Sequence, residues 1–155
     1  CGIYYFKMIY KNEKPFEPIS LGNIDAKRDW SHAIDFVDGV WKMVNQEKPN
    51  EYVLSSNETH TIREFIELAF KEVGIEGFWH GQGTNEEFSI STEYAIKNEV
   101  NSSVLVKIDP KFFRPAEVEL LLGDSSKARL ELGWSPKWSF HQLVKDMVIS
   151  DLNQT

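Results

Sequence analysis

The sequence lacks the features of several protein classes. A single cysteine among 155 residues allows no internal disulfide, and no Cys/His spacing of a metal site occurs. Because structural disulfides belong to oxidising compartments, we expect a reducing, cytoplasmic location. No apolar run is long enough to cross a bilayer, so no membrane span is expected. The first residues, Cys1-Gly2-Ile3, have no start Met and no signal-peptide pattern, which suggests a chain entered partway through.

Positive charge is also scarce. The chain has 17 Lys and Arg residues against 24 Asp and Glu residues, which gives a formal net charge of -7. A protein of this charge repels nucleic acid and anionic membranes, so neither is expected as a partner. A small anion can still bind, because a few local cations dominate the potential inside a cleft.

What the sequence does contain is enough apolar material for one compact domain. Hydrophobic residues make up 41% of the chain, charged residues 26% and aromatic residues 13%, which favours a buried core over disorder. Amphipathic helices alternate with short strands, so the predicted class is mixed α/β. We divide the chain into a segment over residues 1–18, expected to be helical, and a main domain over residues 19–155.

The clearest helix is expected over residues 31–46, with Asp29 or Ser31 as its cap. Helical spacing gathers its apolar residues on one face, so we expect that face to be buried. The residues of this face are Ala33, Phe36, Val37, Val40, Trp41 and Val44. Further helices are expected from capping boxes at residues 61–64 and 139–142, and over residues 125–132.

Short apolar runs predict strands over residues 19–21, 52–55, 78–80 and 104–108. Residues 81–103 are rich in Gly, Asn, Ser and Glu, and have weak periodicity. We therefore expect a loop or a flexible insertion there.

Two basic residues, Lys27 and Arg28, stand just before the clearest helix. Two cations beside the amides of a helix start could hold a phosphate, because a guanidinium is a fork-shaped donor. The alternative is that Arg28 pairs with Asp29 or another surface acid, which is the commoner arrangement for a charged helix start. The neighbouring His32 has no identified partner, and we interpret it as structural.

A second basic position follows the strand expected over residues 104–108. Pro115 fixes the backbone directly after Arg114 and would aim the arginine in a set direction. Glu117 could accept a hydrogen bond from a sugar hydroxyl, as acids do in nucleotide sites. The alternative is a structural Arg–Glu pair within a turn, and these residues alone leave both open.

Four segments, taken in order, carry a more specific signal. Residues 21–33 read LGNIDAKRDWSHA and residues 113–119 read FRPAEVE, while residues 122–128 read LGDSSKA and residues 132–136 read LGWSP. These segments resemble LGN-x-DAKRDWGHA, YFRPAEVE, LLGD-x-x-KA and LGW-x-P of the GDP-mannose 4,6-dehydratases, which are extended short-chain dehydrogenases/reductases. The likeness runs from about residue 20 to residue 152, and Ser31 replaces a usual Gly.

The resemblance implies a site for a GDP-sugar. The members of the family are lyases that convert GDP-mannose to GDP-4-keto-6-deoxymannose and water, with NADP as cofactor. This reaction is the first step toward GDP-fucose and related deoxysugars. By similarity, Arg28 and Arg114 would hold the diphosphate and Glu117 would face the ribose. Asn23 and Lys27, in the first segment, are assigned to the same substrate site.

The resemblance also implies what this chain lacks. The family begins with a Rossmann domain that carries Gly-x-x-Gly-x-x-Gly and the Tyr-x-x-x-Lys of hydride and proton transfer. Tyr10 and Lys14 have that spacing, but Pro15 follows at once and no dinucleotide fold precedes them, so we treat the match as chance.

We therefore expect a small substrate-binding domain of helices and short strands without its Rossmann domain. Such a chain would hold no catalytic, cofactor-binding or metal-binding residues and would be inactive alone. The Rossmann domain would be supplied in cis or in trans, and the complete enzyme would be a homo-oligomer.

Two alternatives stay open. The chain could be the substrate domain of another nucleotide-sugar epimerase or dehydratase. It could instead be a stand-alone, non-catalytic binding or interaction module. A stand-alone module should have a polar surface, whereas a large bare apolar patch would indicate a missing domain.

Overall fold

The computed structural model describes residues 17–97, 104–113, 118 and 120–153. Its strands are β1 (Ile19–Leu21), β2 (Lys27–Arg28), β3 (His60–Thr61), β4 (Gly77–His80), β5 (Glu87–Ile90), β6 (Val104–Ile108) and β7 (Leu120–Leu121). Its helices are α2 (Ala33–Val44), α3 (Ile62–Glu72), α4 (Thr92–Lys97), α5 (Ser126–Leu132) and α6 (Phe140–Asn153), with 3-10 helices η1 (Gly83–Asn85) and η2 (Pro110–Phe112). The mixed α/β prediction is confirmed, while the helix expected in residues 1–18 lies outside the described residues.

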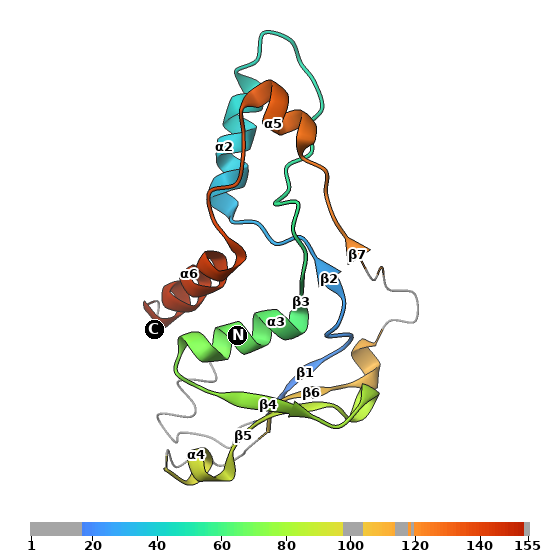
Figure 1. Ribbon diagram of the computed structural model, residues 1–155, viewed down its shortest axis with the longest axis vertical. Helices are drawn as coiled ribbons and strands as arrows, with labels where there is room; N and C mark the ends of the chain where they lie inside the picture. The colour runs from blue at the N-terminus through green and yellow to red at the C-terminus, as the bar shows by residue number, and fades with distance from the viewer. Residues whose placement is uncertain (1–16, 98–103, 114–117, 119, 154–155) are drawn as a thin grey trace.

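The strands form two sheets (Figure 1). The larger has the order β1-β6-β5-β4, and the smaller has the order β3-β2-β7. β1 runs parallel to β6 with Leu21 opposite Ile108, so the segments that follow these two strands leave the sheet at the same edge. β2 lies between antiparallel β3 and parallel β7, which places Arg28 in the central strand of the smaller sheet.

The main core lies between α3 and the larger sheet. Ile66 and Phe70 of α3 pack in one cluster with Phe88 of β5 and Val106 of β6. α6 covers the other side of α3, where Ala69 joins residues of α6 in a second cluster. Burial of each large apolar side chain contributes roughly 1.5–3 kcal/mol, so these contacts hold α3 against the sheet.

The capping boxes form as predicted. The hydroxyl of Thr61 accepts from the backbone N–H of Glu64 (3.1 Å), and the Glu64 carboxylate accepts from the backbone N–H of Thr61 (2.9 Å). At the start of α6, Ser139 and Gln142 exchange the same two bonds. Both helix starts are thereby fixed by local contacts.

α2 and α5 form a third cluster at the opposite end of the elongated molecule (Figure 1). Trp134 is buried there, and its Nε1 donates to the backbone oxygen of Asp35 (2.8 Å). The Asp35 carboxylate accepts from the backbone N–H groups of Lys137 and Trp138 (both 3.1 Å). These bonds fix one face of α2 against the segment that leads to α6.

The apolar face of α2 is a correction to the sequence analysis. The predicted stripe exists, but it faces outward: Val37 is 68% exposed, Trp41 67% and Val44 70%. The buried positions of the helix are Asp35 and Gly39. Nothing in the described part of the chain covers this face. The predicted caps were also wrong, because His32 caps α2 by accepting from the N–H of Ile34 (3.1 Å).

Two predictions about strands need correction. Residues 52–55 have no assigned strand, because no neighbouring strand of the described chain pairs with them. The prediction of a loop over residues 81–103 is wrong at β5, because this strand pairs with both β4 and β6. The four residues of β5 are too short for a clear period, and their burial comes from distant partners. Residues 98–103 lie outside the description.

Candidate functional site

A cavity of about 550 Å³ opens where the larger sheet meets β2. It is lined by Leu21, Gly22, Asn23, Arg28, Ile62, Lys111 and Phe112. Among the described residues, the lining contains two cations and no carboxylate, although the chain as a whole carries a net charge of -7. Such a cavity favours an anionic ligand.

The wall of the cavity is built by close backbone packing between the end of β1 and η2. The backbone N–H of Asp109 donates to the carbonyl oxygen of Leu21 (2.8 Å), and the Asp109 carboxylate accepts from the N–H of Lys111 (2.9 Å). At Gly22 a Cβ would overlap the carbonyl oxygen of Phe112 and lie 2.7 Å from its carbonyl carbon. Only glycine permits this approach, and the approach sets the place of Lys111 beside Asn23.

Arg28 enters the cavity from β2. Its Nη1 donates to the carbonyl oxygens of Val118 (2.8 Å) and Lys27 (2.9 Å). These bonds orient the guanidinium and tie β2 to the segment that precedes β7. Successive residues of a strand point to opposite faces, and Lys27 does not line this cavity.

The two residues after Arg28 hold the fold around it. Asp29 accepts from Ser56 through its backbone N–H (2.9 Å) and hydroxyl (2.7 Å), and from the N–H of Asn57 (3.2 Å). Trp30 stacks on Phe65 with ring centroids 5.0 Å apart. The Asp29 carboxylate thus binds Ser56 and Asn57, while Arg28 donates to backbone oxygens. The alternative in which Arg28 pairs with Asp29 or another surface acid stays open.

The predicted site residues fall into three groups. Asn23 and Arg28 line the cavity, and Asn23 also accepts from the N–H of Asp25 (3.0 Å) through its side-chain oxygen. Lys27 lies outside the lining. Arg114 and Glu117 lie outside the described residues, and their roles stay predictions.

The sequence analysis missed Lys111. A usable signal existed, because Asn23 and Lys111 each follow a predicted strand at short distance. Ligands in α/β proteins bind where the carboxyl ends of parallel strands meet. Finding the site required the pairing of β1 with β6, and a single sequence does not supply that pairing.

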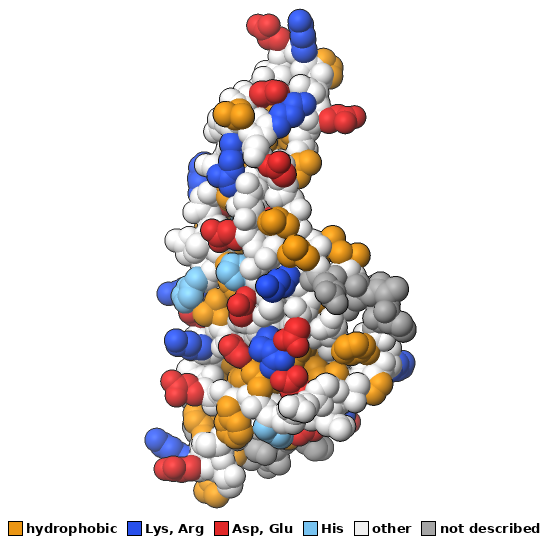
Figure 2. Space-filling model, turned by 45° about the vertical axis from the view of Figure 1, so that its right-hand side comes forward, with side chains coloured by type: hydrophobic (Ala, Val, Ile, Leu, Met, Phe, Trp, Pro, Cys, Tyr) orange, Lys and Arg blue, Asp and Glu red, His pale blue; other side chains and the backbone are white. Residues whose placement is uncertain are grey.

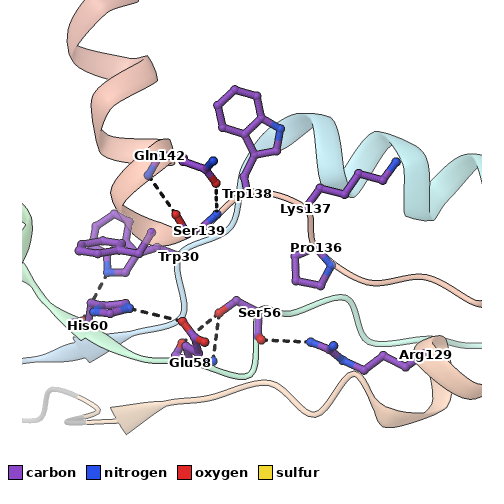
Figure 3. Close-up of a pocket in the computed structure, with 11 residues that line it drawn as sticks. Trp30, Ser56, Glu58, His60, Arg129, Pro136, Lys137, Trp138, Ser139 and Gln142 are labelled. Atoms are coloured by element: carbon purple, nitrogen blue, oxygen red, sulfur yellow. Dashed lines mark hydrogen bonds and ion pairs between the residues drawn. The ribbon is translucent and has the colours of Figure 1, made fainter.

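A second cavity, of about 320 Å³, lies between α5 and the start of α6 (Figure 3). Its Arg129 donates from Nε to the Ser125 hydroxyl (3.0 Å) and from Nη2 to the carbonyl oxygen of Ser56 (3.2 Å). The Glu58 carboxylate also lines it, 3.8 Å from Nε2 of His60. The carboxylate of Glu58 faces this space, so the cavity suits an anion less well than the first.

The starts of α2 and α3 do not fit a dinucleotide. A Rossmann site uses an open glycine-rich turn whose amides face the pyrophosphate. Here the start of α2 is closed by His32, and the start of α3 is closed by its capping box. Within the described ranges, no three His, Cys, Asp or Glu side chains come together as metal ligands. No helix there has the length and apolarity to cross a membrane.

Known proteins match this chain in sequence. The family model described as GDP-mannose 4,6 dehydratase matches residues 5–147. The chain belongs to the GDP-mannose 4,6-dehydratase family. It is 46% identical over 139 residues to the GDP-mannose 4,6 dehydratase of Drosophila melanogaster, covering 90% of this chain and 33% of the relative. The enzyme of Dictyostelium discoideum is 48% identical over 136 residues, with 88% and 36% covered. The chain thus spans about a third of the length of these relatives.

Solved structures agree on the fold. RMD from Pseudomonas aeruginosa, solved with NADPH, superimposes with a TM-score of 0.70 at 16% identity, covering 99% of this chain and 41% of that one. A UDP-glucose 4-epimerase from Thermotoga maritima, solved with UDP-glucose, gives a TM-score of 0.63 at 15% identity, with 97% and 38% covered. At these identities the likeness shows the fold alone. The fold predicted for the family, that of part of an extended short-chain dehydrogenase/reductase, is confirmed.

Proposed function

We propose that this chain is the nucleotide-sugar-binding portion of a GDP-mannose 4,6-dehydratase, a lyase that converts GDP-mannose to GDP-4-keto-6-deoxymannose and water. The observation that carries this proposal is the cavity at the end of β1, whose described lining has two cations and no acid in an acidic protein. A GDP-sugar presents a diphosphate, and a cation-lined cavity with a guanidinium suits that group. Family membership supplies the identity of the base and the sugar.

In this proposal Arg28 and Arg114 hold the diphosphate and Glu117 accepts from the ribose. Asn23 binds the same substrate from the cavity wall. Lys27 is assigned to the substrate by the resemblance alone, because it does not line the cavity. Supporting contacts come from both sides of the segment that contains Arg114 and Glu117. Phe112 lines the cavity, and the carbonyl oxygen of Val118 accepts from Arg28.

NADP is proposed as the cofactor of the complete enzyme, where it would take hydride from the sugar and return it. The starts of α2 and α3 do not fit it, and we propose that it binds to the Rossmann domain. The part proposed for this chain is to bind and orient the nucleotide diphosphate. We expect the chain alone to be inactive.

The remaining partner in this proposal is a Rossmann domain, supplied in cis or in trans. The outward apolar face of α2 supports it, because seven exposed positions of that helix are apolar and its charged residues are buried or half-buried. Apolar side chains are also exposed at the height of β7 in Figure 2, where Leu120, Leu121 and Leu122 are 50–55% exposed. A stand-alone module would be expected to carry a polar surface instead. The complete enzyme is proposed to be a homo-oligomer of the cytoplasm.

Titration of GDP into the chain tests the proposal. We expect weak binding that Arg28→Ala and Arg114→Ala each reduce by about tenfold, the size of a lost charge-assisted hydrogen bond. The matched control is Lys145→Ala, an exposed cation on α6 away from the cavity. Unchanged affinity in both arginine variants would overturn the phosphate roles. Equal affinities for GDP, UDP and dTDP would instead favour another nucleotide-sugar enzyme.

A further inference from the structure

We infer that Lys111 is a further cation of the diphosphate site, contacting the same phosphate groups as Arg28. The inference rests on the proposed function, and it adds a residue that neither the motifs nor the comparisons point to. It begins from the cavity, where Lys111 and Arg28 line one space from different elements. Lys111 comes from η2 and Arg28 from β2, so two segments more than 80 residues apart in the chain bring positive charge to one place.

The backbone around Lys111 is held in place by several contacts. Asp109 is bonded through its N–H to Leu21, and its carboxylate caps η2 by accepting from the N–H of Lys111. Pro110 fixes the backbone at the first position of this turn. The Gly22–Phe112 packing leaves little room for η2 to shift. A cation on this turn is therefore placed by the fold rather than by its own long side chain.

Among the described residues, no carboxylate forms an ion pair with the ammonium group of Lys111, and the aromatic ring recorded near it is that of Phe112, 5.8 Å from Nζ. Two described acids that could compete for it have other partners. Asp109 caps η2, and Asp25 pairs with Arg63 (2.9 Å).

Two positive groups that line one space raise the local potential and favour an anion placed between them. A diphosphate carries enough negative charge to satisfy both groups. Lysine acts as a point charge on phosphate, whereas arginine supplies a directed fork. Arg28 would thus orient the diphosphate, and Lys111 would mainly add attraction. Lys111 is expected to contribute more to the salt dependence of binding than to its selectivity.

The test uses the full chain and its Lys111→Gln variant, which keeps an extended polar side chain, one atom shorter, and removes its charge. The control is Lys107→Gln, an exposed lysine on β6 that does not line the cavity. Binding of GDP, inorganic pyrophosphate and guanosine is measured at two salt concentrations. We expect Lys111→Gln to raise the Kd for GDP and for pyrophosphate about fivefold at low salt. We expect it also to flatten the salt dependence, and Lys111→Arg to restore most of the affinity.

Each outcome is decisive. If Lys111→Gln matches Lys107→Gln while Arg28→Ala weakens GDP, the inference about Lys111 is wrong and the proposed function stands. If pyrophosphate binding depends on Lys111 but GDP binds no better than UDP, the anion site stands and the GDP-sugar assignment falls. If the wild-type chain binds neither GDP nor pyrophosphate at millimolar concentration, both proposals are overturned.

Discussion

Replacing Gly22 with alanine should damage the candidate site through the backbone alone. The added Cβ would overlap the carbonyl oxygen of Phe112 and lie 2.7 Å from its carbonyl carbon. Both neighbours are main-chain atoms and cannot rotate away, so the end of β1 and η2 must separate by roughly 1 Å to restore ordinary contact. That shift stretches the 2.8 Å bond from Asp109 to Leu21. It also moves Lys111 relative to Arg28.

We expect Gly22→Ala to lower the free energy of unfolding by about 1–3 kcal/mol, the usual cost of overpacking. The Kd for GDP should rise about tenfold, because the two cations no longer face one ligand. Urea unfolding followed by tryptophan fluorescence measures the first effect, and isothermal titration measures the second.

The matched control is Gly74→Ala. Gly74 has a φ of +74° and no atom within 4 Å of an added Cβ, so alanine there is strained but meets nothing. It should cost about 1 kcal/mol of stability without changing GDP affinity. If Gly22→Ala matches the wild type in both measurements, the packing between β1 and η2 does not shape the cavity, and the reasoning is refuted.

Three further predictions concern the rest of the molecule. V37K combined with W41K should change the free energy of unfolding by less than about 0.5 kcal/mol per substitution. The double variant should no longer associate with a separately produced Rossmann domain in size-exclusion chromatography. A large loss of stability would mean that the chain itself buries this face. His32→Ala should cost about 1 kcal/mol in urea unfolding through loss of the α2 cap, and an unchanged midpoint would refute that role. Hydrogen bonds from Ser126 lower the pKa of Asp124 from its ordinary value of 3.8. The ionised carboxylate therefore stabilises the fold fully above pH 3.8, and this stabilisation is lost as the pH falls through the lowered pKa. Asp124→Asn should therefore flatten the acid limb of the stability curve, and an unaltered limb would contradict this.

Local signals predicted most of the helices correctly. Capping boxes and glycine stops act within a few residues, so Thr61 with Glu64, and Gly133 after α5, could be recognised from the sequence. β5 could not be recognised, because its burial depends on strands before and after it in the chain. The outward face of α2 was mispredicted for a related reason. Helical spacing identifies an apolar stripe, but it does not say whether the covering surface belongs to the same chain.

The residues of the candidate site also divide into those that the sequence predicts and those that only the structure reveals. The sequence motifs predicted Arg28 and Asn23 as site residues, and the structure brings both to one cavity. Lys111 sits in no recognised motif and became visible only through the parallel pairing of β1 and β6. Asp29 belongs to the same motif, and its carboxylate fixes the turn at Ser56. The motif sequence alone does not reveal this role.

The most direct test of the central claim is a map of amide chemical shifts in the chain as GDP is added. The account predicts that the largest changes fall on Gly22, Asn23, Lys111 and Phe112, that pyrophosphate reproduces part of them, and that guanosine alone leaves these four amides nearly unmoved. Changes that concentrate instead around Arg129 and Ser139, in the second cavity, would contradict the claim that the cation-lined cavity at the end of β1 receives the diphosphate.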